Sequence, residues 1–414
     1  KITSTNDGYN MTEFKDIPKS SAPKDKVLAY SVSIPVGVTQ SYTIEFKYAN
    51  DESVDQSIDM GKKLSGTLFI TEGTEPTLLS QLLADKSTVL TRTDFSTVLT
   101  NDNTNTLYTS TEDSKTVYYF AGNATDNWVK FGKNASNQDL YWRIIRTNSD
   151  GSVRLLYHGT STTATDTVIN SSTGFGAHIN DPMYVGYMYG TSGSLENNRT
   201  NENSSTIKGV IDTWYASNLE AKGYTKYLSR TAVYCNDRSN PAGGYNTGNT
   251  RFNYGAETRL NTNKTPSYDC AATEDKFTVD TSTGNGKLTY PIALMTADEV
   301  SFAGGLAGKY NANAWYFRNA KEGTLTTSSD STDASYSSTD STYWWLLSPD
   351  GWISSRAGVF IVCGSTYPGQ LGSSYVSSPH GVRPAVSLKS CVKTSGGDGS
   401  SNAPYTIEES TSGC

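Results

Sequence analysis

The chain has 414 residues, of which only 18% are charged, and its formal net charge is −7. An aromatic content of 11% excludes an intrinsically disordered chain, because disorder goes with few aromatics and high net charge. The absence of any apolar run of about 18 residues excludes a transmembrane helix. A pI of about 5.2 argues against nucleic acid, which needs clustered Lys and Arg. The excess of Ser, Thr, Asn, Gly and Tyr is typical of β-rich secreted or cell-surface proteins.

The first 70 residues are predicted to be β-rich. Residues 1–26 are polar and are predicted to form an arm or a partial strand. From 27 to 70 apolar and polar side chains alternate, as in VLAYSV and SYTIEFKY, and such period-two alternation indicates half-buried strands. This layer is too small for a complete sandwich, so we expect another segment to cover it.

A junction and then one long β-rich unit follow. Glu75-Pro76 precedes LLSQLLADKSTVL, which predicts a short amphipathic helix with Pro near its first turn. Residues 76–105 are therefore interpreted as a linker with a short helix. Beyond it, YWRIIRT and SVRLLYHG flank a turn that contains Asp150-Gly151, which predicts a β-hairpin.

One longer helix is predicted in the middle of the chain. Residues 206–219 place Ile207, Val210, Ile211 and Trp214 at the spacing i, i+3, i+4, i+7. This spacing lines one face of a helix, so the four side chains are expected to face the core.

Several later features are assigned to the scaffold. Thr296 and Glu299 have the spacing of a capping box at the start of a short helix. Residues 326–343 are predicted to form a polar surface loop, 344–349 a buried strand and 381–389 the last strong strand. Packing or internal hydrogen bonding, rather than binding, is expected for Trp142, Trp214, Trp344, Trp345, the Arg143/Arg146 pair and Arg383.

The five cysteines are too few for a disulfide scaffold, and no C-x-x-C occurs that would indicate a zinc site. Cys235 and Cys270 bracket loop-like sequence, and we predict a bridge between them; the alternative is two buried free thiols. Cys391 and Cys414 bracket a Ser/Gly tail and could form a second bridge or remain free. Cys363 is left over and is expected to be buried.

A search for catalytic motifs is negative. The three histidines, His158, His178 and His380, share no metal-ligand spacing. No GxSxG, Walker loop or strand-following GxGxxG appears. A nucleophilic Cys needs a positioned base, and Cys363 has only the distant His380. No catalytic residue, metal or cofactor is therefore predicted, and enzymatic activity is not expected.

The segment 350–380 has an unusual composition. It contains seven Ser, five Gly, two Tyr and one Trp, but no Lys, Glu, Met or Asn. Adaptable binding surfaces use these residue types, because aromatics give contact area and Ser/Gly give pliable hydrogen bonding. The alternative is a β-meander with loose turns. The candidate binding residues are Trp352, Ser354, Ser355, Arg356, Tyr367, Gln370, Ser373, Ser374, Tyr375 and His380.

Several ordered motifs between 106 and 392 resemble an uncharacterised domain family of exported proteins from Gram-positive, gut-type bacteria. The motifs are VYYFAGN, NWVKFG, YWRIIRTNSDGSVRLLYHG, STIKGVIDTWY, YCNDRS, ALMTADEVSFAGG, YWWLLSP and GVRPAVSLK. The resemblance implies a C-type-lectin-like fold, shared with formylglycine-generating-enzyme-like domains and with variable proteins diversified by retroelements. It implies that GVRPAVSLK is scaffold and that the residues before it are displayed. Enzymes of that superfamily use cysteine pairs, and Cys363 has no partner Cys in its segment.

Residues 31–70 are similar to the end of camelysin/TasA-type secreted β-sandwich proteins, which build extracellular fibres. Only the last strands match, so a strand from the arm 1–26 or from another subunit is expected to complete the sandwich. The fold class is therefore α+β. The expected parts are a β-rich sandwich-like or fibre-like domain (1–75), the linker (76–105), a C-type-lectin-like mixed α/β domain (106–392) and a Ser/Gly-rich tail (393–414).

Three functions are compatible with these features. The first is a cell-surface or fibre-displayed adhesion protein that presents a diversified binding face near 350–380 to an unknown protein or glycan. The second is an extracellular fibre or pilus subunit that self-assembles through its N-terminal β-region, with a decorative second domain. The third is an enzyme of the formylglycine-generating superfamily. Lectin-like folds can bind calcium, but no dense oxygen-ligand motif appears, so no calcium site is predicted.

Overall fold

The computed structural model divides the chain into two compact units, Lys1–Pro76 and Thr77–Cys414. The residues that the structure describes are 2–4, 39, 41–45, 55, 57, 60–61, 76–99, 103–164, 167–241, 245, 251–307, 343–353, 355–363, 370–410 and 414. The predicted polar loop, apart from residue 343, lies outside them. Most of the strands predicted between 27 and 70 also lie outside them.

In the first unit the N-terminal arm contributes a strand. Strand β1 (Ile2–Ser4) pairs antiparallel with β2 (Tyr42–Ile44), with Ile2 opposite Ile44. Tyr42 and Ile44 are half-buried whereas Thr43 between them is exposed, which is the alternation expected of a strand with one covered face. The expectation that the arm pairs with the β-layer therefore holds for these residues.

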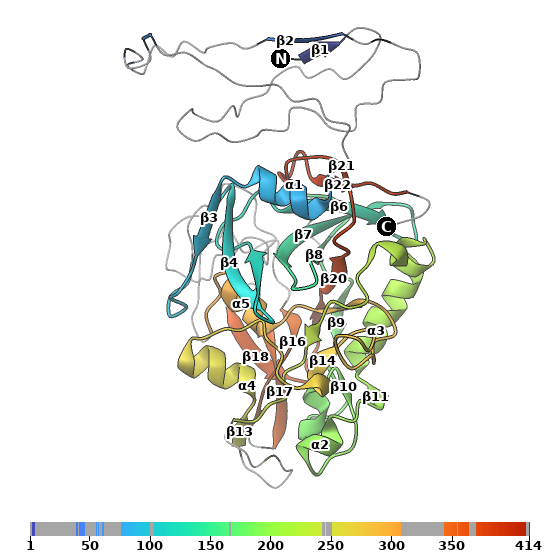
Figure 1. Cartoon of the computed structure of the whole chain (residues 1–414). Helices are drawn as coiled ribbons and strands as arrows, with labels where there is room; N and C mark the ends of the chain where they lie inside the picture. The colour runs from blue at the N-terminus through green and yellow to red at the C-terminus, as the bar shows by residue number, and fades with distance from the viewer. Residues whose placement is uncertain are drawn as a thin grey trace. The chain divides into compact units, whose positions relative to one another are not determined.

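The second unit is a mixed helix-and-sheet structure made mostly of strands (Figure 1). Its larger sheet contains β3 (Thr88–Thr91), β4 (Thr106–Glu112), β5 (Lys115–Tyr119), β6 (Trp128–Lys133), β7 (Asp139–Thr147), β8 (Val153–Gly159), β15 (Ile292–Leu294), β20 (Pro384–Leu388), β21 (Thr394–Gly396) and β22 (Tyr405–Ile407). The main order is β15-β20-β8-β7-β5-β4-β3, while β6 joins β7 to β22, which pairs with β21. The late strand β20 thus lies beside the early strand β8, as the red and teal ribbons of Figure 1 show.

The predicted hairpin is confirmed. Strands β7 and β8 pair antiparallel, with Thr147 opposite Val153. The turn closes through a hydrogen bond from the Asn148 N–H to the Ser152 carbonyl. Gly151 has a φ of +79°, a conformation that glycine adopts without steric cost.

The smaller sheet carries the segment that was singled out for binding. Its strands are β9 (Asn170–Thr173), β13 (Arg251–Asn253), β16 (Trp344–Ile353), β17 (Arg356–Val362), β18 (Leu371–Tyr375) and β19 (His380–Val382). The order is β18-β17-β16-β19-β9, and β13 also pairs with β16. Two short pairs lie apart from both sheets: β10 (Met188–Tyr189) with β11 (Asn203–Ser204), and β12 (Tyr234–Cys235) with β14 (Lys276–Phe277). The predicted buried strand 344–349 is the first part of β16, and its side chains are buried.

The helices are short. They are α1 (Leu78–Asp85), α2 (Leu195–Asn198), α3 (Thr206–Tyr215), α4 (Gly255–Glu257) and α5 (Ala297–Phe302). The capping box at α5 is confirmed: Thr296 caps the Glu299 N–H, and Glu299 reaches back to the Thr296 N–H. In the described part of the chain, no helix is long and apolar enough to cross a membrane.

Helix α3 confirms the predicted stripe only in part. Ile207 and Ile211 are fully buried, whereas Val210 and Trp214 are half-buried. Tyr215 is also buried, so the buried face is centred closer to Ile211 and Tyr215 than the spacing alone predicted. The helix then continues as a π-helical turn over Ala216–Glu220, which the sequence reading did not separate from it.

The segment expected to be a linker belongs to the second unit. Leu78 and Leu82 of α1 are buried in the main core, and the Leu78 N–H donates to the Val392 carbonyl. The helix ends at Asp85, and β3 begins at Thr88 and pairs in parallel with β4. The expected tail likewise joins the larger sheet, because β22 pairs with β6.

Candidate binding face

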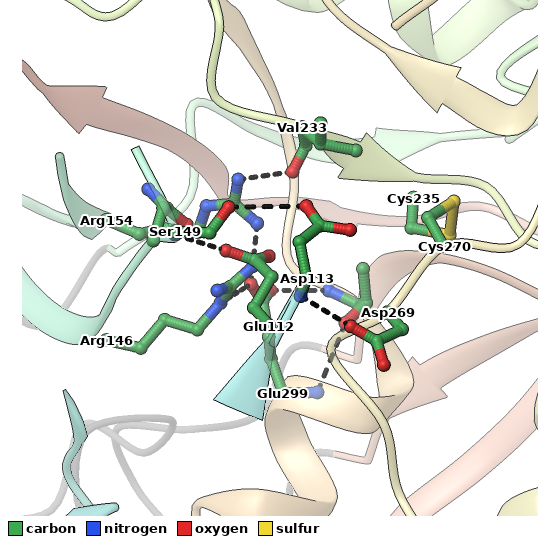
Figure 2. A network of polar contacts seen from close by, with 12 residues as sticks. Glu112, Asp113, Arg146, Ser149, Arg154, Val233, Cys235, Asp269, Cys270 and Glu299 are labelled. Carbon is green, nitrogen blue, oxygen red and sulfur yellow. Dashed lines mark hydrogen bonds and ion pairs between the residues drawn. A yellow bond between two sulfur atoms is a disulfide. The ribbon is translucent and has the colours of Figure 1, made fainter. Parts of the chain in front are cut away.

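A buried polar network joins elements that are far apart in the sequence (Figure 2). Arg146 on β7 and Arg154 on β8 both donate to the same oxygen, Oε1 of Glu299 on α5, at 2.8 and 2.6 Å. Arg146 also donates to Glu112 Oε1 at 2.8 Å, and Glu112 Oε2 accepts from the Ser149 N–H at 2.5 Å. The two guanidinium groups are thus held by two carboxylates, which satisfies most of the buried donors.

Electrostatics in this network favour the ionised forms. Burial alone would raise the pKa of Glu299, but Arg154 and Arg146 outweigh burial and hold that pKa below its ordinary value. Burial would lower the pKa of Arg146, yet Glu112 and Glu299 outweigh it and raise that pKa. Removing one partner would leave an unpaired buried charge, which is far more costly than the pair itself. The network therefore locks α5 to the sheet and confirms the internal role expected for Arg146.

A second ion-pair cluster borders the network and encloses a shallow depression. Arg259 binds both oxygens of Asp298, at 2.8 and 2.7 Å, and donates to Asp237 at 2.7 Å. The depression lies between this cluster and Arg146, Arg154 and Cys235, and its volume is about 10 Å³. A space of this size holds a single water molecule. The arginines here are therefore paired with carboxylates, and the space between them is too small for a substrate.

Two disulfides are present in the second unit. Cys235 and Cys270 are bonded, as predicted, and Figure 2 shows this bridge beside the network. Cys391 and Cys414 are bonded as well, which settles the alternative that the sequence left open. Cys363 is a buried free thiol, as expected.

Four of the predicted binding residues are exposed together on the smaller sheet. Ser355 directly precedes β17, Arg356 begins it, and Ser373 and Tyr375 lie on β18. The Arg356 guanidinium lies 5.0 Å from the centre of the Tyr375 ring, and Tyr375 is 39% exposed. Arg356 and Tyr375 lie on neighbouring antiparallel strands, so sheet pairing brings together residues that are distant in sequence.

The prediction that Trp352 belongs to the binding face is wrong. This side chain was expected to contact a ligand, but it is only 1% exposed and belongs to the main core. On the sheet it lies between Phe252 of β13 and Ala357 of β17. Residues directly opposite each other share a face of the sheet, so Trp352 lies on the same covered face as the buried Ala357, and the segment's composition could not reveal which face is covered.

The other predicted residues are less accessible or undescribed. Ser374 and His380 are half-buried and hydrogen-bonded to each other at 2.8 Å, and the His380 ring packs on Trp345 at 4.8 Å. Gln370 is half-buried, and its carbonyl accepts from the Cys363 N–H. Ser354 and Tyr367 lie outside the described residues.

Burial shifts the pKa values of two histidines and of the free cysteine. Burial, with Arg143 and Arg383 nearby, holds the pKa of His158 well below its ordinary value. Burial also lowers the pKa of His380 and raises that of the Cys363 thiol to about 12. Among the described residues no group of three His, Cys, Asp or Glu side chains could hold a metal ion.

The remaining scaffold assignments agree with the structure. Arg383 is 1% exposed, donates to the Tyr157 carbonyl, and lies 4.9 Å from the centre of the Trp344 ring. Arg143 is buried over Trp128 and donates to Asn127 and to the Ala124 carbonyl.

The sequence reading missed an exposed apolar edge. All four residues of β3 are exposed, including Val89 at 52% and Leu90 at 44%, and Leu83 on the preceding helix is 38% exposed. The sequence pattern predicts that the apolar residues of this segment form one continuous helix. A signal was nevertheless present, because STVLT is rich in β-branched residues, which favour strands.

A family model described as "Domain of unknown function (DUF6273)" matches residues 267–390. The matched segment includes Cys270, Glu299 and the whole of β16 to β20. No curated protein and no solved structure matches the chain. The matched family's description names no activity, so function has to be argued from the geometry above.

Proposed function

We propose that this protein is an extracellular ligand-binding protein, and that the start of β17 and the strand β18 present its binding face to a protein or glycan. The observation that carries the proposal is the exposed pair of Arg356 and Tyr375, with its guanidinium–ring distance of 5.0 Å. Arg and Tyr are over-represented among residues that dominate binding energy. Ser355 and Ser373 beside them add adaptable hydrogen-bonding groups.

The backbone around Tyr375 supports the proposal. Tyr375 is opposite Gly358, which in turn is opposite Gly351, so neither neighbour in that row has a side chain to cover the flank of the ring. Val359 of the next strand points to the opposite face, where it is buried in the core and fixes the sheet beneath. A rigid support with an accessible aromatic side chain limits the ordering cost that binding must overcome. The C-type-lectin-like fold implied by the sequence motifs would suit this use, and it is part of the proposal.

An array of glycans and proteins tests the proposal, with the wild-type chain compared with Tyr375→Ala and Arg356→Ala. Each substitution should weaken a specific hit about 30-fold, as expected for truncation of a residue worth ~2 kcal/mol. Matched controls are Leu83→Ala, which removes another exposed apolar side chain, and Arg230→Ala, which removes an exposed arginine paired with Asp280. A hit that both face variants retain at full strength would place the binding site elsewhere.

The pairing of β1 with β2 favours a second candidate, a fibre subunit. Residues Ile2–Ser4 already act as a strand added to the N-terminal β-layer, and an arm of another copy could occupy the same place. Such donor-strand exchange would build fibres by backbone pairing. Deleting residues 1–26 should then abolish filaments seen by electron microscopy. Unchanged assembly and stability after this deletion would contradict the idea.

A further inference from the structure

The buried ion pair of Lys86 and Asp126, which is separate from both clusters described above, has an unusual environment. Lys86 follows helix α1, and Asp126 lies between β5 and β6. The Lys86 Nζ is 2.6 Å from Oδ2 of Asp126 and 2.9 Å from its backbone carbonyl oxygen. The exposed fractions of the two side chains are 1% and 7%. An amine and a carboxyl group are therefore in direct contact with almost no access to water.

Two aromatic rings and a carboxylate oxygen without a hydrogen-bond partner in the described part of the chain border this contact. The Lys86 Nζ lies 5.7 Å from the centre of the Phe120 ring and 5.6 Å from that of Tyr405. Oδ1 of Asp126 is buried and has no hydrogen-bond partner among the described atoms. The desolvation cost of a buried ion pair can exceed its Coulombic gain, and conversion of the pair to an uncharged amide would remove that cost. A lysine amine in direct contact with an aspartate carboxyl group is the reactant pair for amide formation.

Both partners are held in place. The Asn105 N–H donates to Asp126 Oδ2 at 2.7 Å. Gly399 packs so closely on the Asp126 carbonyl that a Cβ there would lie 2.3 Å from its oxygen. On the other side, the Lys86 N–H donates to the Leu82 carbonyl and closes the end of α1. Fixed contact of this kind converts an intermolecular reaction into an intramolecular one with a very high effective concentration.

We propose that Lys86 and Asp126 condense to form an intramolecular isopeptide bond. One proton first moves from Nζ to the carboxylate along the 2.6 Å contact, which leaves a neutral amine and a neutral acid. The Nζ lone pair then attacks Cγ, the Nζ–Cγ bond forms, and the bond from Cγ to the hydroxyl oxygen breaks. That hydroxyl leaves with one Nζ proton as water, so the products are an uncharged amide and one water molecule. The step needs no oxidant, reductant or co-reactant.

A hydrogen-bonded tyrosine covers the reacting amine. The Tyr405 hydroxyl donates to Asp85 Oδ2 at 2.9 Å, and the Tyr405 ring lies over the Lys86 amine. Burial raises the pKa of this hydroxyl, Asp85 raises it further, and Asp126 adds to the effect. The hydroxyl therefore stays protonated, and its hydrogen bond to Asp85 holds the ring that covers the Lys86 amine.

Mass spectrometry of the full chain tests the proposal. After complete reduction and denaturation, the wild-type protein should be one water lighter than its sequence. Trypsin should fail to cleave after Lys86 and should release a branched peptide that joins the segments around Lys86 and Asp126. Lys86→Arg and Asp126→Ala should each restore the full sequence mass.

An internal control is the exposed pair of Lys130 and Asp139. Its nitrogen–oxygen distance is 2.7 Å, but the side chains are 38% and 28% exposed, so water stabilises the charges and the peptides should remain linear. A wild-type protein that unfolds cooperatively, yet has the full sequence mass and is cleaved after Lys86, would overturn the proposal. This result does not depend on whether the variants fold, and it is independent of ligand binding.

Discussion

Oε1 of Glu299 lies 2.6 Å from Nη1 of Arg154, although 145 positions separate the two residues. The same oxygen accepts from Arg146, so one carboxylate holds two strands and a helix together. We expect Glu299→Gln to lower the free energy of unfolding by about 3–5 kcal/mol, the usual cost of breaking a buried ion pair on one side. Urea unfolding measures this loss. Glu202→Gln on the exposed surface should change stability by less than about 0.5 kcal/mol, and equal effects of the two variants would contradict the role of the network.

Trp352→Ala is expected to impair folding rather than recognition. Because the side chain is 1% exposed, its removal leaves a large cavity and should cost about 3–5 kcal/mol. Tyr375→Ala, which removes a side chain that is 39% exposed, should cost much less. Thermal unfolding of both variants checks the contrast. Similar losses for the two would show that Trp352 is not packed as described.

The stability of the second unit should depend on pH through His158. Its folded-state pKa lies well below the ordinary value of 6.5 because the ring is buried near Arg143 and Arg383. Below pH 6.5 the unfolded chain therefore binds a proton that the folded chain does not, and stability falls as pH decreases. The contribution is fully present above this pH. The free energy of unfolding of wild type and of His158→Gln should be measured between about pH 8 and about pH 5, and it should depend less on pH in the variant. Parallel curves would contradict the assignment.

The cysteines predict a simple labelling pattern. Of the five cysteines, four are in disulfides and Cys363 is buried. A pKa of about 12 for the Cys363 thiol leaves almost no reactive thiolate at neutral pH. Iodoacetamide should therefore modify no cysteine in the native protein, one after unfolding without reductant, and five after reduction. Labelling of Cys363 in the native state would show that its strand opens.

The bridge between Cys235 and Cys270 should contribute strongly to stability. It closes a loop with a separation of 35 residues, and the loop-entropy relation gives about 4 kcal/mol for this length. The double variant Cys235→Ser/Cys270→Ser should lose about this amount in urea unfolding. Cys363→Ser is the matched control for replacing a buried sulfur that is not in a bridge. A double variant as stable as wild type would mean that the loop is held by other contacts.

The elements predicted correctly from the sequence are those that depend on interactions between residues close together in the chain. The hairpin of β7 and β8 and the capping box of Thr296 and Glu299 depend on residues a few positions apart, and both are present. The buried face predicted for α3 is confirmed in part for the same reason. The helix predicted after Glu75-Pro76 is wrong beyond Asp85, because STVLT forms a strand by pairing with β4. That partner lies outside any local window.

Spacing and residue type were sufficient to predict the hairpin, the capping box and a segment with the composition of a binding surface, and they favoured the bridge between Cys235 and Cys270 over two free thiols. Which of the candidate residues are accessible depended on the tertiary structure. Trp352 lies on the face of the smaller sheet that the core covers, whereas Arg356 and Tyr375 are exposed together. The tertiary structure also determined that Glu299 meets Arg146 and Arg154, and that Lys86 meets Asp126. Burial and long-range contact depend on how strands order themselves in a sheet, and that order is a property of the whole chain.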